Sequence, residues 1–121
     1  MERFDLPSPP PVFSARRVTI VENFAPYVFE GTGVPQQWWR EFRTHAVSGK
    51  LADLHAAFGP AQDYEQTGDR VFFTLPTRWT GITAGHRFVE RGGWAFVLER
   101  ESGAWRIRSY AWAVTDTTVA S

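Results

Sequence analysis

The sequence contains no cysteine and has no excess of charge of either sign. Without cysteine, a disulfide framework, a thiol nucleophile and a thiolate metal site are all excluded. The 13 basic and 13 acidic residues give a formal net charge of zero, so no net field attracts the chain to nucleic acid or to an anionic membrane. We therefore expect neither nucleic acid nor a membrane among its partners.

Long apolar runs and cofactor motifs are also missing. No run approaches the ~20 residues that span a bilayer, and the N-terminus lacks a charged segment followed by an apolar one. These absences predict a cytoplasmic protein. His45, His55 and His86 are scattered, and there is no glycine-rich phosphate loop, nucleophile elbow or Ser-His-Asp grouping. We accordingly predict neither a metal nor a cofactor.

Aromatic side chains, by contrast, are abundant. Six Trp, ten Phe and three Tyr make up 16% of the chain. Such side chains are costly to expose, and they can line a concave site with apolar faces and a few polar tips. A ligand cavity and a large aromatic core both account for this composition. The 121 residues are enough for one domain with one core, without disulfide or metal.

The N-terminal half of the chain predicts an extended arm, a strand and a helix. Residues 1–15 form the arm, because four prolines within the first twelve residues fix φ and remove backbone donors, and residues 16–121 form the domain. β-Branched residues favour a strand over residues 14–21. A helix over about residues 33–47 is indicated by Thr32 as its cap, by Pro35 in its first turn, and by the spacing of Trp38, Trp39, Phe42 and Ala46.

The C-terminal half predicts strands joined by short turns. Bulky β-favouring side chains occupy residues 70–75, 85–90 continuing into 94–99, and 105–114. Turns are expected at Gly68-Asp69, at Thr80-Gly81 and at Glu101-Ser102-Gly103. Strands with such tight turns form an antiparallel sheet, since a parallel pair needs a crossover of about a dozen residues or more. Residues 51–58 suit a helix face as well as a strand.

Three segments carry a familiar pattern. Residues 92–112 read GGWAFVLERESGAWRIRSYAW, residues 18–31 read VTIVENFAPYVFEG, and Gly68-Asp69-Arg70-Val71 precedes an aromatic strand ending in Leu75-Pro76. Together they resemble the nuclear transport factor 2-like superfamily over roughly residues 16 to 114. The resemblance implies an α+β, cone-shaped, strongly curved antiparallel sheet packed on one main helix, with a pocket inside. It also implies that residues 53–65 are a strand broken near Gly59-Pro60.

The superfamily leaves activity open, because it contains ketosteroid isomerase, polyketide cyclases, scytalone dehydratase and non-catalytic transport and assembly proteins. Its members place two helices before the strand that begins here near residue 16, where this sequence has only the proline-rich arm of residues 1–15. An apolar concavity left open in this way favours a homodimer or another protein partner.

Glu22 is the candidate general base. In the ketosteroid isomerase branch a proton-shuttling aspartate lies nine residues before the glycine that opens the third helix, and Glu22 lies nine residues before Gly31. Burial among aromatic side chains would raise the pKa of this carboxyl toward neutrality. If the alignment shifts by one residue, Asn23 takes this place and cannot accept a proton. That branch also uses a Tyr and a protonated Asp; Trp94 stands where the Asp would be, so the whole isomerase mechanism is not implied.

Period-two alternation groups further side chains on one face of the last two strands. Trp94, Phe96 and Leu98 share a side with Tyr110, Trp112 and Val114, whereas Trp105 and Ile107 belong to the convex face. His86, Phe88 and Glu90 join the first group only if no bulge interrupts Gly92-Gly93. Because helix neighbours diverge by about 100°, one of Trp38 and Trp39 should point away from the core.

These residues support three hypotheses. The first is a homodimeric domain that binds a small hydrophobic ligand, with Phe24, Tyr27, Glu90, Trp94, Phe96 and Trp112 on the pocket wall. The second is a proton-transfer enzyme of isomerase, dehydratase or cyclase type acting on a small hydrophobic carbonyl compound, with Glu22 as base and His86 or Tyr110 polarising the carbonyl. The third is a protein-interaction module.

A Glu22 carboxylate that points to solvent would exclude the second hypothesis, the proton-transfer enzyme. Each candidate also has a non-functional alternative. Glu22 can be a salt-bridged loop carboxylate, His86 can be exposed near its turn, and Glu90 can be paired with Arg87 and Arg91.

Overall fold

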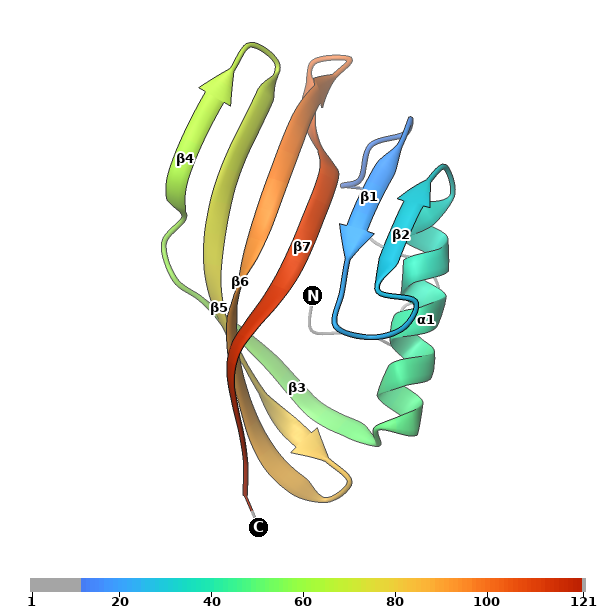
Figure 1. The fold of residues 1–121 in the computed structure, drawn as a ribbon, viewed down its shortest axis with the longest axis vertical. Helices are drawn as coiled ribbons and strands as arrows, with labels where there is room; N and C mark the ends of the chain where they lie inside the picture. Colours follow the sequence, from blue (N-terminus) through green and yellow to red (C-terminus); the bar gives the residue numbers. More distant parts are fainter. Residues whose placement is uncertain (1–11, 121) are drawn as a thin grey trace.

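The protein is described here by a computed structural model that covers residues 12–120. Its elements in chain order are β1 (Val18–Val21), β2 (Val28–Gly31), α1 (Val34–Ser48), β3 (Leu51–Phe58), β4 (Gln62–Thr67), β5 (Arg70–Thr83), β6 (His86–Glu101) and β7 (Ala104–Val119). The strands form one sheet in the order β2-β1-β7-β6-β5-β3, with β4 paired to β5. In Figure 1 the long strands β5, β6 and β7 twist along their length, and α1 lies beside the β1–β2 hairpin.

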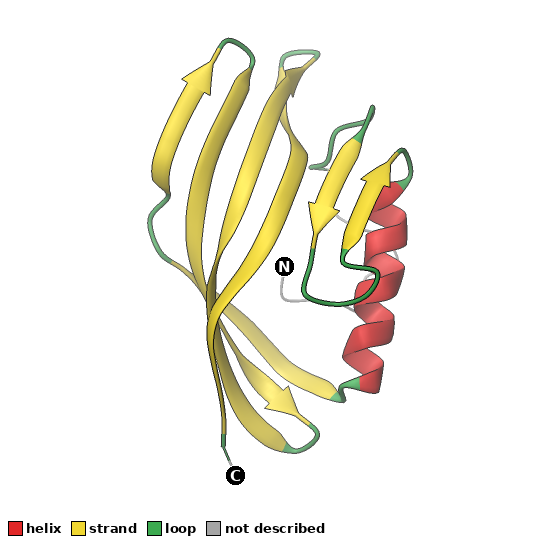
Figure 2. Cartoon of the chain, in the orientation of Figure 1, coloured by secondary structure: helices red, strands yellow, loops and turns green. Residues whose placement is uncertain are grey.

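This architecture confirms the predicted α+β fold, in which a strongly curved, unclosed sheet packs on one main helix. Figure 2 shows α1 in red on one side of the yellow strands. The helix covers Val34–Ser48 rather than residues 33–47. The sheet is mixed rather than wholly antiparallel, because β1 pairs in parallel with β7. The intervening chain is long enough for that crossover, since it contains α1 and five strands.

Both tryptophans at the centre of α1 are buried, which corrects the prediction that one of them points outward. Trp38 is 3% exposed and Trp39 is 2% exposed. The helix contacts β1, β2 and β3, so a wide arc of its surface is covered and two neighbouring positions fit within it. The expected Thr32 cap is also wrong: Gly33 is the N-cap, in a left-handed conformation and without a side-chain cap hydrogen bond.

The predicted turn at Thr80-Gly81 is wrong, because β5 runs through both residues to Thr83. The turn lies at Ala84-Gly85, where both residues have positive φ angles of 49° and 84°. Gly81 serves another purpose. A Cβ there would lie 2.9 Å from the Phe88 ring, so glycine permits close approach inside the sheet. The segment that was ambiguous in sequence forms β3, and a break at Gly59-Pro60 separates it from β4.

The bulges of the last hairpin lie in β7, whereas β6 continues unbroken through Gly92-Gly93. The pairing steps from Arg91↔Asp116 to Gly92↔Val114, and a second irregularity separates Val97↔Ser109 from Leu98↔Ile107. Each step leaves one extra β7 residue and reverses the alternation of the side chains beyond it. Ile107 therefore packs against the core, contrary to its predicted place on the convex face.

The segment before β1 is attached to the domain. Phe13 forms an isolated parallel bridge with Ile107, and the Ser14 hydroxyl donates a hydrogen bond to the Glu101 carboxylate. The predicted arm of residues 1–15 otherwise lies outside the described residues, since these begin at residue 12. In the described range, no helix is long and apolar enough to cross a membrane.

Candidate functional site

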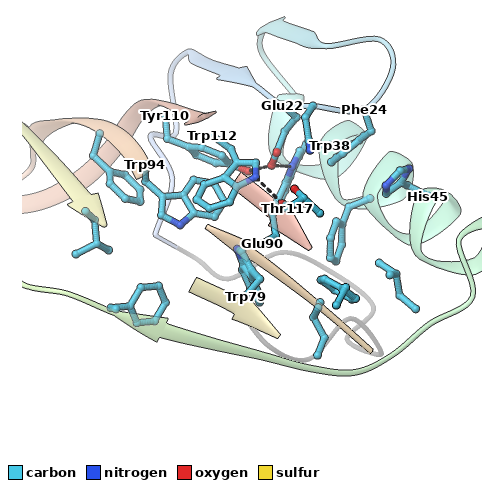
Figure 3. A pocket seen from close by; sticks show the side chains of 18 of the residues that line it. Glu22, Phe24, Trp38, His45, Trp79, Glu90, Trp94, Tyr110, Trp112 and Thr117 are labelled. Atoms are coloured by element: carbon cyan, nitrogen blue, oxygen red, sulfur yellow. Dashed lines mark hydrogen bonds between the residues drawn. The ribbon is translucent and has the colours of Figure 1, made fainter. Parts of the chain in front are cut away.

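A cavity of about 730 Å³ lies between the curved sheet and α1. Ligand pockets commonly enclose roughly 300–1,000 Å³, and this volume falls within that range. Four tryptophans from different strands and the helix border the space, namely Trp38, Trp79, Trp94 and Trp112. The polar lining includes two carboxylates, Glu22 and Glu90. Figure 3 shows the two carboxylates within the same group of aromatic side chains.

Local strand geometry turns Glu22 into the cavity. Val18 and Ile20 are buried on one face of β1, and Glu22 follows on the same face by period-two alternation. The Glu22 amide donates a hydrogen bond of 2.9 Å to the Tyr27 carbonyl, which closes the β1–β2 hairpin at this point. The side chain is 7% exposed and lines the cavity. Asn23, the alternative from a shifted alignment, is exposed.

Two side chains from distant elements hold the Glu22 carboxylate. Tyr110 of β7 donates its hydroxyl proton to Oε2 at 2.8 Å, and Trp38 of α1 donates its indole N–H to the same oxygen at 2.9 Å. Both bonds appear in Figure 3 as dashed lines. A carboxylate fixed by donors on a helix and a strand cannot rotate freely, so one of its oxygens keeps a constant position in the cavity.

Burial raises the pKa of Glu22 to about 7, because desolvation penalises the charged carboxylate. The hydrogen bonds from Tyr110 and Trp38 act in the opposite direction, and the nearby Glu90 charge raises the pKa further. Burial, followed by the neighbouring Glu22 carboxylate, also raises the pKa of Tyr110 well above its usual value. Tyr110 therefore stays protonated and remains a donor across the neutral range, while Glu22 exchanges a proton there.

Glu90 forms a second pair of the same kind. Its Oε1 accepts the indole N–H of Trp112 at 3.0 Å. Trp112 in turn contacts Trp94 with ring centroids 4.7 Å apart, and Trp94 meets the Tyr110 ring edge-to-face at 4.9 Å. The Trp38 ring lies 5.8 Å from the Tyr110 ring, so a continuous aromatic wall runs from Trp38 to Trp112. The tryptophan at each end of this wall donates its indole N–H to one of the two carboxylates.

The residues predicted from the sequence are only partly brought together. The cavity lining contains these members of the predicted set: Glu22, Phe24, Glu90, Trp94, Phe96, Tyr110 and Trp112. Leu98 and Val114 do not belong to the lining.

Two predicted site residues lie outside the cavity, and both assignments are corrected. Tyr27 is 58% exposed, because its backbone turns at a φ of 72° and its N–H and carbonyl close the hairpin loop. His86 has the strand parity expected of a pocket residue, but it is the first residue of β6, beside the β5–β6 turn. It is exposed there and does not line the cavity. Neither residue retains the predicted role at the site.

Sequence reasoning did not assign the helix side of the cavity. Trp38, Phe42 and His45 line it from successive turns of α1, and the His45 ring stacks on Phe24 at 5.1 Å. Their spacing of four and three residues was the available signal for a shared helix face. Trp79, Phe88 and Thr117 also line the cavity. Of these, only Phe88 was predicted from the strand alternation, on the condition, met in β6, that no bulge interrupts Gly92-Gly93. Among residues 12–120, no group of three or more His, Cys, Asp or Glu side chains could hold a metal ion.

The curved, unclosed sheet, the helix packed on it and the aromatic cavity between them are the features of a cone-shaped α+β fold with a pocket. No protein-family model matches the chain, and no curated protein is similar to it in sequence. Solved structures show that the chain has the nuclear transport factor 2-like fold. A type 2 hexachlorocyclohexane dehydrochlorinase, LinA, aligns with a TM-score of 0.73 at 10% identity over 92% of this chain and 72% of its own.

Two further solved structures share this fold. The type 3 LinA from Novosphingobium barchaimii aligns with a TM-score of 0.73 at 11% identity, covering 91% of this chain and 73% of that one. A nuclear transport factor 2-like protein of unknown function from Pseudomonas putida has a TM-score of 0.63 at 10% identity, with 84% and 67% covered. At these identities the likeness establishes the fold, and activity has to be inferred from the site.

Proposed function

We propose that this protein binds a small, largely apolar molecule in the cavity and exchanges a proton with it through Glu22. One observation carries the proposal: a carboxyl group with a pKa of about 7 is fixed on the wall of a 730 Å³ aromatic cavity. A general base works best when its pKa lies near the operating pH. An ordinary surface carboxylate has a much lower pKa and faces water, so neither property is expected of a structural loop residue.

The surroundings of Glu22 assign a supporting role to its partners. Tyr110 and Trp38 donate hydrogen bonds to Oε2, which favours the ionised form that accepts a proton. Tyr110 is therefore a positioning residue for Glu22, and its hydroxyl is not directed at a substrate carbonyl. His86 lies outside the cavity and has no part in the proposed step. The reaction class is proton abstraction by a carboxylate, as in isomerases, dehydratases and eliminations.

The dehydrochlorinases among the structural neighbours are consistent with this class. Removal of hydrogen chloride from a substrate requires an acceptor for the proton. Because only the fold is shared at 10% and 11% identity, the chlorinated substrate is not transferred to this chain. These neighbours support one point only, namely that this fold accommodates proton removal from a small apolar molecule.

A probe reaction tests the proposal without knowledge of the natural substrate. Nitrobenzisoxazole is a flat aromatic molecule that needs only a base: the base removes the ring C–H proton, the C–H electron pair forms the nitrile, and the N–O bond breaks to release a coloured phenolate. We expect turnover that rises with pH around a midpoint near 7, the pKa of Glu22. Because base catalysis contributes roughly 100-fold to 10,000-fold, Glu22→Gln should lower the rate by about 100-fold or more.

A matched substitution controls for the loss of a carboxylate on the same hairpin. Glu30 is exposed on β2, and Glu30→Gln breaks only an exposed ion pair with Arg17 at 3.5 Å, so its rate should equal that of the wild type. Binding is measured separately with nitroindazole, an unreactive analogue, through quenching of tryptophan fluorescence. Wild-type turnover that survives Glu22→Gln contradicts the role of Glu22. Binding without turnover leaves a ligand-binding protein and removes the proton transfer.

A further inference from the structure

The charges on the cavity wall have one sign. Glu22 and Glu90 both line the cavity, and no lysine or arginine belongs to its described lining. The arginines that flank Glu90 in sequence are paired elsewhere, since Arg87 meets Asp53 at 3.5 Å and Arg91 meets Asp116 at 3.1 Å. Among the described residues, neither Glu22 nor Glu90 forms an ion pair. Residues 12–120 therefore supply two carboxylates to an apolar cavity and no lysine or arginine to balance them.

Each carboxylate is bonded to the edge of an indole whose ring borders the cavity. Glu22 accepts from Trp38 at 2.9 Å, and Glu90 accepts from Trp112 at 3.0 Å. An indole that donates its N–H to an anion gains electron density on its ring, and tryptophan is already the best aromatic acceptor of a cation. The Trp94 ring continues the wall between them, 4.7 Å from Trp112.

We propose that the molecule bound in this cavity carries a cationic nitrogen, a tertiary or quaternary ammonium on an apolar body. The inference rests on the proposed function to the extent that the cavity must be a binding site. Alkylammonium groups are weakly hydrated, so they can leave water for an aromatic site, where ring faces and carboxylates stabilise the charge. An anion would be repelled by both carboxylates. A wholly neutral ligand would desolvate them further and provide no charge in return.

The same arrangement predicts a coupling between cation binding and the protonation of Glu22. Among residues 12–120, the titratable groups facing the cavity are Glu22 directly after β1, His45 on α1, Glu90 on β6 and Tyr110 on β7. A bound cation favours the ionised carboxylate, so affinity for a cation should rise as pH increases through the pKa of Glu22, about 7. Affinity for a neutral molecule should not rise in this range.

A pair of probes with equal shape and different charge tests the inference on the wild-type protein. Phenyltrimethylammonium carries a cationic nitrogen where tert-butylbenzene has a carbon, and both are titrated by calorimetry and by quenching of tryptophan fluorescence. We expect the cation to bind at least about tenfold more tightly than the neutral probe above pH ~7. Glu22→Gln and Glu90→Gln should each reduce that preference, because each removes a charge that stabilises the bound cation and that tert-butylbenzene would only desolvate.

The possible outcomes separate this inference from the proposed function. Equal binding of the two probes, or tighter binding of tert-butylbenzene, overturns the cationic ligand and leaves an apolar binding cavity. Binding of nitroindazole without binding of either probe also overturns the cationic ligand and leaves an apolar binding cavity. If nitroindazole also fails to bind, the proposed function fails together with the inference. If the protein still prefers the cation when both Glu22 and Glu90 are replaced, the two carboxylates are not the cause of that preference.

Discussion

Replacement of Glu22 by Gln should change how the stability of the fold depends on pH. In the folded protein, burial raises the pKa of this carboxyl from its ordinary value of 4.5 to about 7. Below pH ~4.5, Glu22 is protonated in both the folded and the unfolded chain, so its ionisation does not disfavour folding. As the pH rises, the unfolded chain loses the proton first, and the folded state becomes less favourable until the pH passes about 7.

The magnitude follows from the difference between the two pKa values. A difference of one pKa unit corresponds to about 1.4 kcal/mol, so a rise from 4.5 to about 7 amounts to about 3 kcal/mol. Glu22 is buried, which makes screening by solvent small. In the wild type, this stabilisation is fully present below pH ~4.5 and is lost as the pH rises through about 7. Gln does not titrate, so Glu22→Gln removes the pH-dependent contribution and leaves only a constant offset from its altered hydrogen bonds.

Urea unfolding followed by tryptophan fluorescence measures the effect at pH values from about 5 to about 8. The free energy of unfolding of Glu22→Gln, minus that of the wild type, should increase across this range by about 2.5 kcal/mol, because a smaller part of the effect falls below pH ~5. Glu65→Gln, which removes an exposed carboxylate from β4, should preserve the wild-type slope, because Glu22 is still present. Parallel curves for the wild type and Glu22→Gln would refute the conclusion that a buried, proton-exchanging carboxyl lies in the cavity.

Two further predictions concern the residues that position this site. Tyr110→Phe removes a hydrogen-bond donor that lowers the pKa of Glu22. The pH midpoint of probe turnover should therefore move upward, and the free energy of unfolding should fall by about 1–3 kcal/mol. An unchanged midpoint would show that the hydrogen bond at Oε2 does not affect the pKa of Glu22. Gly92→Ala places a Cβ 2.1 Å from the Ala113 carbonyl oxygen, whereas a Cβ at Gly93 has its nearest neighbour at 3.5 Å. Thermal unfolding should therefore show a loss of about 2 kcal/mol or more for Gly92→Ala and clearly less for Gly93→Ala; equal losses would contradict a tight passage of β7 at Gly92.

The resemblance identified Glu22, from its place nine residues before Gly31. The structure adds a local reason for the orientation of its carboxylate: Glu22 directly follows β1 and continues the alternation of the buried Val18 and Ile20. The resemblance to a known fold also indicated where the helix and the last hairpin would lie. The partners of Glu22 were harder to predict, because Tyr110 is 88 residues away and Trp38 donates from α1. The homodimer predicted from the open concavity stays a prediction.

The errors within the strands share one physical cause, which is that alternation along a strand does not determine where the strand ends or shifts its register. His86 has the correct parity but lies at the end of β6, and Gly81 looks like a turn residue while it admits the Phe88 ring inside the sheet. The irregularities in β7 are defined by its register with β6, a separate strand, so the residues of β7 alone do not predict them. They also decide the composition of the site. Ile107 and Tyr110 are three residues apart and have opposite parity, so without the reversal between them β7 could not contribute both side chains to the cavity lining.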